Sequence, residues 1–180
     1  ILRVFLGLFL ISLSLFLIVS IFTYDSSDPG LGKIVGKSEI INVGGFWGAI
    51  SSSVLIILFG KTSLLLTVFT LYVGAFIVLG IEIKRLFLKF LLILISINLI
   101  NISLLFQKNF EIEVGLFSKI LFDIYEFYFP SLVNSFLYIT LSLSCFTLIS
   151  IILVLYCFSI NISFLKNIFI KILRFNYFNP

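Results

Sequence analysis

The stretch "NVGGFWGAISSSVLIILFGKTSLLLTVFTLYVGAFIVLG" (Asn42–Gly80) contains one charged residue, Lys61, and decides how often the chain crosses a membrane. Residues 44–60 number 17, the lower limit for a transmembrane helix, whereas residues 62–80 number 19 and are long enough to cross. A break at Gly60 and Lys61 is favoured, because glycine tolerates a turn and lysine requires water or a polar partner. The stretch is therefore either two spans or one span preceded by a helix that only dips into the lipid.

Composition places the rest of the chain in the same environment. Of its 180 residues, 61% are hydrophobic and only 11% are charged, against about 25% charged residues in soluble domains. The apolar runs are continuous rather than alternating, which favours membrane helices over a barrel. The sequence predicts an all-α integral membrane protein with four transmembrane helices in two repeats, each repeat having a short interfacial or re-entrant helix.

The net charge of +4 does not indicate a nucleic-acid surface, because the basic residues are spread over loops and form no block. The chain has no histidine, so metal ligands are scarce and the most common general base is missing. We therefore predict no enzyme activity, no catalytic residue, no metal site and no cofactor site in this chain.

Two repeats account for the chain as a single membrane domain. In repeat one (1–80) we expect a span over 4–22, an outer loop over 23–43, a short helix over 44–59 and a span over 62–80. In repeat two (86–158) we expect a span over 87–106, an outer amphipathic helix over 115–129 and a span over 132–158. Residues 159–180 are expected to begin a cytoplasmic linker. The missing initiator methionine suggests a fragment of a longer protein.

The positive-inside rule does not choose between four and five spans. With four spans and both ends cytoplasmic, seven Lys and Arg residues lie inside and five outside; with five spans and an external N-terminus the numbers are eight and four. Both arrangements place residues 81–89 and the C-terminal tail inside and residues 107–130 outside.

An internal repeat favours four spans. A shift of 70 residues places Gly45 on Gly115, and each half then reads as span, polar loop, short glycine-started segment and second span. The second short segment has Lys119, Asp123 and Glu126 on one helical face and an apolar stripe on another, so it lies at the interface rather than crossing. By analogy, residues 44–60 form a shallow helix on the same outer side.

Polar and aromatic residues of the predicted spans and outer segments allow two interpretations each. Asn98 and Asn101 lie three apart in one span and either hydrogen-bond neighbouring helices or line a polar path. The outer aromatic residues serve as a headgroup belt or as contacts for partner proteins; these residues are Tyr24, Trp47, Tyr125 and Tyr128.

Three ordered motifs carry a family resemblance: "YDSSDPG" (24–30), "NVGGFWGA" (42–49) and "FGKTSLLL" (59–66). In this order they resemble the N-terminal membrane domain of the FtsK/SpoIIIE DNA translocases. The positions that match the family motifs residue by residue are Tyr24, Asp28, Pro29, Asn42, Gly44, Gly45, Gly48, Ala49, Phe59 and Gly60.

The resemblance implies a four-span anchor in the bacterial inner membrane, with cytoplasmic termini, that tethers a hexameric cytoplasmic DNA pump at the division septum. The implied partners are the lipid bilayer, divisome membrane proteins and further copies of the chain. DNA, ATP and magnesium would bind only the motor domain, which is absent from this chain. Gly60-Lys61-Thr62 is not a phosphate-binding loop, because Leu55 stands where the motif requires its first glycine. The alternatives are a stand-alone small membrane protein and a four-helix transporter subunit.

Overall fold

The computed structural model describes residues 1–31, 40–107, 113–130 and 135–160. The chain forms α1 (Leu2–Phe22), α2 (Gly45–Phe59), η1 (Lys61–Ser63), α3 (Leu64–Leu79), α4 (Leu86–Leu105), α5 (Leu116–Tyr128) and α7 (Phe136–Cys157). Within these described ranges there is no strand. Four helical segments are long and apolar enough to cross a membrane: Leu2–Phe22, Lys61–Leu79, Leu86–Leu105 and Phe136–Cys157. The predicted all-α membrane class with four spans is confirmed.

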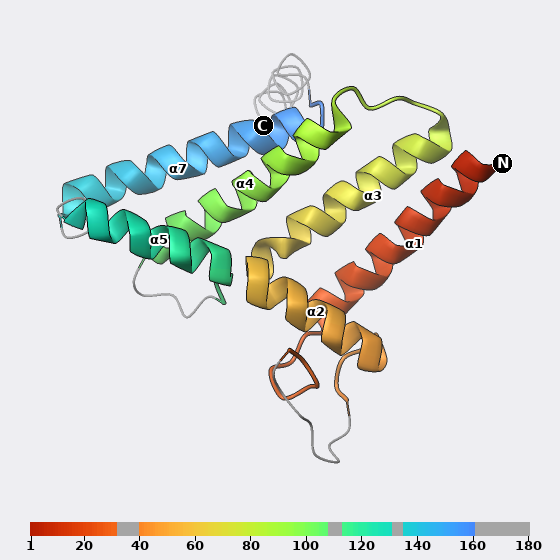
Figure 1. The fold of residues 1–180 in the computed structure, drawn as a ribbon, viewed down its shortest axis with the longest axis horizontal. Coiled ribbons are helices and arrows are strands. Elements are labelled where there is room, and N and C mark those ends of the chain that lie inside the picture. Colours follow the sequence, from red (N-terminus) through yellow and green to blue (C-terminus); the bar gives the residue numbers. More distant parts are fainter. Residues whose placement is uncertain (32–39, 108–112, 131–134, 161–180) are drawn as a thin grey trace, which may run out of the picture.

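Helices α1 and α3 form an antiparallel hairpin (Figure 1). Near the start of α1, the Arg3 Nε donates to the carbonyl of Ile77 at 3.2 Å, and near its middle the Ser14 hydroxyl donates to the carbonyl of Thr67 at 2.5 Å. Between these contacts Gly7 faces Gly74, where a Cβ on Gly7 would lie 2.9 Å from the Gly74 carbonyl oxygen. Small residues thus let the two backbones approach closely, as membrane helix pairs require.

Helices α4 and α7 form a second antiparallel hairpin. The Ser96 hydroxyl donates to the carbonyl of Ser150 at 3.2 Å, and the Cys157 thiol donates to the carbonyl of Lys89 at 3.3 Å. This serine contact corresponds to the Ser14–Thr67 contact of the first hairpin, but it lies 82 and 83 residues later in the chain. The shift of 70 residues therefore aligns the short helices but not α1 with α4, because the loop before α2 is longer than the loop before α5.

The short helices α2 and α5 lie at the same end of the molecule (Figure 1). Because α3 runs back along α1, it begins at the end where α1 finishes, and α2 does not carry the chain to the opposite end. We call this the short-helix end. The N-terminus, the loop over residues 80–85 and the end of α7 lie at the other end, which we call the hinge end.

Two apolar clusters hold the helices together, and the first of them connects the two hairpins. Phe69 and Val73 of α3 pack with Ile93 of α4 and Cys157 of α7. The Phe158 ring, just after α7, lies 5.8 Å from the Phe69 ring, so the end of the second hairpin rests on the first. The other cluster joins α4, α5 and α7 around Ile102 and Phe106, together with Phe122, Tyr125, Ile139, Leu143 and Phe146.

The face of α5 that packs against the rest of the protein is not the one that the sequence interpretation indicated. The charged residues Lys119, Asp123 and Glu126 are exposed as expected, but the predicted apolar stripe is exposed too. Ser118, Phe122 and Tyr125 form the face that meets α4 and α7. Tyr125 therefore belongs to the interior rather than to an outer aromatic belt, while Trp47 and Tyr128 are exposed.

Two further boundaries differ from the sequence interpretation. The last long helix is observed from Phe136, and residues 131–134 of the predicted span 132–158 lie outside the described residues. Of the predicted linker, residues 161–180 also lie outside them. Lys89, near the start of α4, is only 5% exposed, and its ammonium donates to the Ser159 hydroxyl.

Candidate functional site

The motif residues gather at the short-helix end, where the Asp28 side chain closes the loop that precedes α2. Its two carboxylate oxygens accept the backbone N–H groups of Ile41 and Asn42, each at 2.8 Å. Asp28 is buried, and a buried carboxylate is tolerated where backbone donors satisfy it. This contact brings together the two ends of the loop over residues 29–40.

Asn42 continues the arrangement toward α1. Its side-chain amide donates to the carbonyl of Ser20 at 2.8 Å and lies 3.4 Å from the Ser52 hydroxyl, while its Oδ1 accepts the N–H of Gly44 at 2.9 Å. One buried side chain therefore joins the end of α1 to both the start and the middle of α2. We call the set Ser20, Asp28, Asn42, Gly44 and Gly48 the Asp28–Asn42 clasp.

The glycines of the clasp leave no room for a side chain. A Cβ on Gly44 would lie 2.6 Å from the Ser20 Oγ, and one on Gly48 would collide with the Asn42 Oδ1. Gly45 has a different role, because nothing lies within 4 Å of its Cβ position but its φ is +62°. The motif thus uses two glycines for close approach and one for a left-handed backbone turn.

The buried face of α2 continues from the clasp with small residues. Ala49 is 1% exposed, and the Ser52 hydroxyl donates to the carbonyl of Gly48 at 2.7 Å. The Ser53 hydroxyl accepts the N–H of Leu31 at 3.2 Å, which ties the loop to α2. Pro29, between this contact and Asp28, is half-buried. The small face of α2 lies against α1 and the loop, so α2 is held along its length.

At its far end α2 meets the second repeat. Gly60 has φ 72° and ψ −174°, a conformation open almost only to glycine, and its Cβ would lie 2.6 Å from the Glu113 carbonyl oxygen and 2.8 Å from the Gly115 nitrogen. The Lys61 N–H donates to the Glu113 carbonyl at 3.2 Å. The rings of Phe59 and Phe117 lie 5.6 Å apart. We call this crossing the Gly60–Gly115 junction.

Two asparagines of α4 support the junction from below. Asn101 donates from Nδ2 to the carbonyl of Phe59 at 2.6 Å, and its Oδ1 accepts the Thr62 hydroxyl at 2.8 Å. Asn98 accepts the hydroxyl of Ser118 at 2.9 Å. Each asparagine therefore binds one of the two short helices, and helix–helix hydrogen bonding is the role that the structure shows for both.

Tyr24 lies beside this junction, in a cavity of about 250 Å³ whose lining also includes Ile56, Ile57, Glu113, Val114, Leu116 and Lys119. Burial raises the pKa of the Tyr24 phenol above its usual 10.0, and the negative charges of Glu113 and Asp25 raise it further. The phenol is thus kept neutral. Tyr24 thus lines the same cavity as Glu113 and Lys119 of the second half of the chain.

The chain matches a known family over most of its length. The 4TM region of the DNA translocases FtsK/SpoIIIE matches residues 1–120 of the chain. The chain belongs to this family. No curated protein and no solved structure gives a significant match. The FtsK/SpoIIIE match ends within α5, so the last long helix, α7, is placed by its packing on α4 rather than by the comparison.

The structure brings most of the predicted FtsK/SpoIIIE motif residues into two contact sets. Asp28, Asn42, Gly44 and Gly48 form the clasp, whereas Phe59 and Gly60 form the junction. Sequence reasoning missed Ser20 and Ser52 as their partners, whereas hydrogen bonding by Asn101 to neighbouring helices was one of the two interpretations of that residue. One signal was present: Gly44, Gly48 and Ser52 recur every four residues, a small-residue spacing typical of close helix packing.

The chemistry of these contacts is structural. Lys61 pairs with Glu113 at 3.6 Å and Thr62 bonds Asn101, so the side chains of the Gly-Lys-Thr sequence face protein groups rather than forming a phosphate cradle. Among the residues that the structure describes, no group of three or more His, Cys, Asp or Glu side chains is placed to hold a metal ion. The 4TM region is a membrane region and not a motor.

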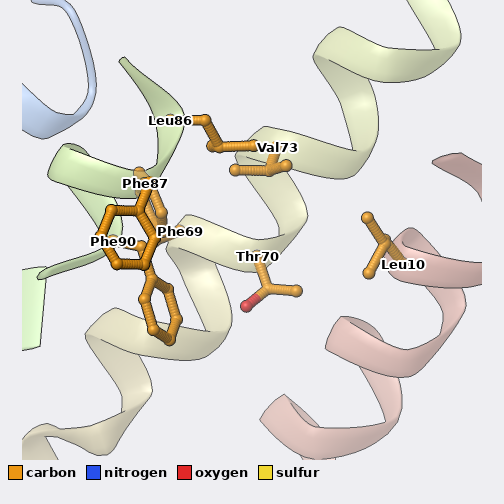
Figure 2. A pocket seen from close by; sticks show the side chains of 7 residues that line it. All are labelled: Leu10, Phe69, Thr70, Val73, Leu86, Phe87 and Phe90. Carbon is orange, nitrogen blue, oxygen red and sulfur yellow. The ribbon is translucent and has the colours of Figure 1, made fainter. Parts of the chain in front are cut away.

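An apolar groove separates the two hairpins toward the hinge end. Figure 2 shows side chains of α1, α3 and α4 around a cavity of about 340 Å³, lined by Leu10, Phe69, Thr70, Val73, Leu86, Phe87 and Phe90. The Thr70 hydroxyl donates to the carbonyl of Leu66 at 2.8 Å, so the groove presents hydrocarbon rather than free hydrogen-bonding groups. This lining does not suit a polar transported substrate.

Proposed function

We propose that this chain is the membrane anchor of an FtsK-like DNA translocase. It would hold a cytoplasmic DNA-pumping ATPase at the division septum and contribute to divisome assembly and chromosome segregation. Family membership supports the proposal.

The observation that carries the proposal is the polarity of the molecule. Both described ends of the chain lie at the hinge end, and the motif contacts lie at the opposite end. Among the described residues, the hinge end has four basic residues, Arg3, Lys84, Arg85 and Lys89, whereas the short-helix end has two, Lys61 and Lys119. By the positive-inside rule the hinge end faces the cytoplasm of a bacterial inner membrane. A motor following α7 would then lie on the side where DNA is found.

The short-helix end would face outward and meet division proteins. Helices α2 and α5 expose large aromatic side chains there, including Trp47 at 73% and Phe127 at 79% exposure. Because the clasp and the junction fix both short helices, these rings lie on a rigid surface and not on a loop. Homo-oligomerisation, including a hexamer, would follow from the implied motor.

The test is localisation of the whole chain, fused to a fluorescent protein after Pro180, in dividing rod-shaped bacteria. A band at mid-cell is expected; an even signal along the envelope contradicts the proposal. A Gly48→Leu variant, which forces α2 away from Asn42, should insert but lose the band. Trp47→Ala, which leaves the clasp intact, separates loss of a surface contact from loss of the fold.

The transporter alternative has its own readout. Solute flux through liposomes that requires Asn98 and Asn101 would favour transport over anchoring. We expect no such flux, because both side chains are engaged by the short helices.

A further inference from the structure

A second cavity, at the hinge end, has a very different lining from the groove of Figure 2. It has a volume of about 500 Å³ and lies between the start of α4 and the end of α7. Three of its six lining residues are cations: Lys84, Arg85 and Lys89. The other three are Tyr156, Ser159 and Ile160. Cavities of this size are typical of small-molecule sites.

Lys89 is the unusual member of this set. Its side chain is 5% exposed, yet its ammonium is hydrogen-bonded to a neutral hydroxyl, that of Ser159, and lies 6.0 Å from the centre of the Tyr156 ring. Buried charges are normally paired with an opposite charge. Over the described residues the one ion pair is Lys61–Glu113, at the opposite end of the molecule. The Lys89 charge is therefore uncompensated by the protein within that part of the chain.

The sequence offers little to compensate it. Residues 83–110 and 127–180 contain no Asp or Glu. The nearest acidic residue in the chain, Glu82, lines a different cavity, with Arg3, Val73, Ile77, Ile81, Ile83 and Leu86. Three cations thus converge on a site without a carboxylate, and the missing charge has to come from a ligand.

The surroundings identify the kind of anion. The site lies at the end of two membrane helices, where headgroups are found. An exposed apolar strip on α7, formed by Leu148, Ile152 and Tyr156 at intervals of four residues, runs from the cavity toward the middle of the helix. An acyl chain can pack against such a strip, whereas a small free anion cannot. Guanidinium and ammonium groups are the usual partners of phosphate.

We propose that this cavity binds the phosphate group of an anionic phospholipid. Arg85 and Lys84 contact the phosphate from the rim, Lys89 contributes its charge from within, and the acyl chains follow the strip on α7. The backbone supports this assignment, because Arg85 and Ser159 line the site and are the described non-glycine residues with positive φ, 56° and 54°. Such conformations are costly and gather at functional sites. The proposal does not depend on septal anchoring.

The experiment measures lipid binding by the whole chain in detergent, titrated with phosphatidylglycerol or phosphatidylcholine and read by native mass spectrometry. Phosphatidylglycerol should bind more tightly. Lys84→Gln and Arg85→Gln should each weaken it about fivefold, and the double variant about 25-fold. Both residues are exposed, so these variants keep the fold, which circular dichroism checks. Lys89→Met removes the buried charge and, if this variant folds, should also weaken phosphatidylglycerol binding.

The matched control is Arg3→Gln, which removes one charge at the same end but outside the cavity. It should leave phosphatidylglycerol binding within twofold of the parent chain. An equal loss in Arg3→Gln would mean general attraction to a basic surface and overturn the site. Equal affinity for both lipids, or displacement of phosphatidylglycerol by millimolar inorganic phosphate, would overturn the lipid assignment. Loss of septal localisation with lipid binding intact would affect the proposed function alone.

Discussion

Gly60 and Gly115 lie backbone against backbone, so that a Cβ added to Gly60 would come within 2.8 Å of the Gly115 nitrogen. One glycine ends the short helix of the first repeat and the other precedes the short helix of the second. Together with Asn101, this contact fixes the two repeats to each other at the short-helix end. The junction is thus a joint between halves of the molecule rather than a simple helix break.

Replacing Gly60 with alanine should destabilise the chain strongly. The substitution forces a strained backbone and a clash with the Glu113 carbonyl, together about 3 kcal/mol or more. The control is Gly45→Ala, where φ is also positive but the Cβ position is open, so the cost should be about 1 kcal/mol. Reversible denaturation in mixed micelles measures both. Equal costs would show that close approach to Gly115 is unimportant.

Asp28→Asn should loosen the closure of the loop that precedes α2. The amide can accept one of the two N–H groups but turns its own N–H₂ toward the other, which costs about 2 kcal/mol. Protection of the Ile41 and Asn42 amides from hydrogen exchange reports the effect directly. Asp25→Asn serves as the comparison, because Asp25 caps the nearby Ser27 instead. Unchanged protection in Asp28→Asn would contradict the clasp.

Asn101→Ala should release the end of α2. The Phe59 carbonyl loses its amide donor and the Thr62 hydroxyl loses one of its two acceptors. Because Thr62 still donates to the Phe59 carbonyl at 2.9 Å, the cost should be about 1–2 kcal/mol. Cross-linking yield between cysteines placed at Leu58 and Val114 should fall. Ser103→Ala, on the same helix and bonded only to the Ile100 carbonyl, should leave the yield unchanged.

Tyr24 should ionise at higher pH than an exposed tyrosine. Its pKa is raised because burial, Glu113 and Asp25 all disfavour phenolate. The raised pKa means that stability linked to the neutral phenol is full below pH 10.0, the unfolded value, and is lost as pH rises through the folded pKa. The phenolate absorbance of the parent chain minus that of Tyr24→Phe measures it. A difference titration centred at or below pH 10.0 would contradict the burial.

The proposed orientation predicts from which side of the membrane a cysteine at each end of the molecule can be labelled. In cells whose outer membrane is permeabilised and whose inner membrane is intact, a membrane-impermeant maleimide should label Lys61→Cys and Lys119→Cys but not Lys84→Cys. A background with Cys145→Ser removes the exposed native thiol, and Cys157 is buried. Labelling of Lys84→Cys together with protection of Lys61→Cys would reverse the orientation and remove the support for a cytoplasmic motor.

The long helices were predictable because their signal is local. Continuous apolar runs such as residues 4–22 have one solution in lipid, so α1, α3, α4 and α7 follow from hydropathy and length. The charged face of α5 was equally visible. Its protein-facing side was not, since Ser118 and Tyr125 become interior only through partners on α4 and α7, Asn98 and Phe146.

The sequence motifs picked out Asp28, Asn42, Gly44 and Gly48, but not the contacts that these residues make. Asp28 sits in a serine-rich turn, and local turn chemistry suits Asp25, which does bond Ser27. That Asp28 instead reaches Ile41 depends on where a long loop returns, which sequence spacing does not encode. Gly44 and Gly48 allow close approach, and the partners of the neighbouring Asn42 side chain are defined only by the folded chain.

The Ser159 hydroxyl lies between Tyr72 of α3, at 3.3 Å, and Lys89 of α4. Mechanical load applied to the chain beyond α7 would therefore not fall on one helix. It would be distributed through Ser159 and the adjoining Phe158 ring to both hairpins, so that pulling the last helix out requires breaking its seat on the first. An attachment point built in this way resists traction along the membrane normal better than a single terminal span would.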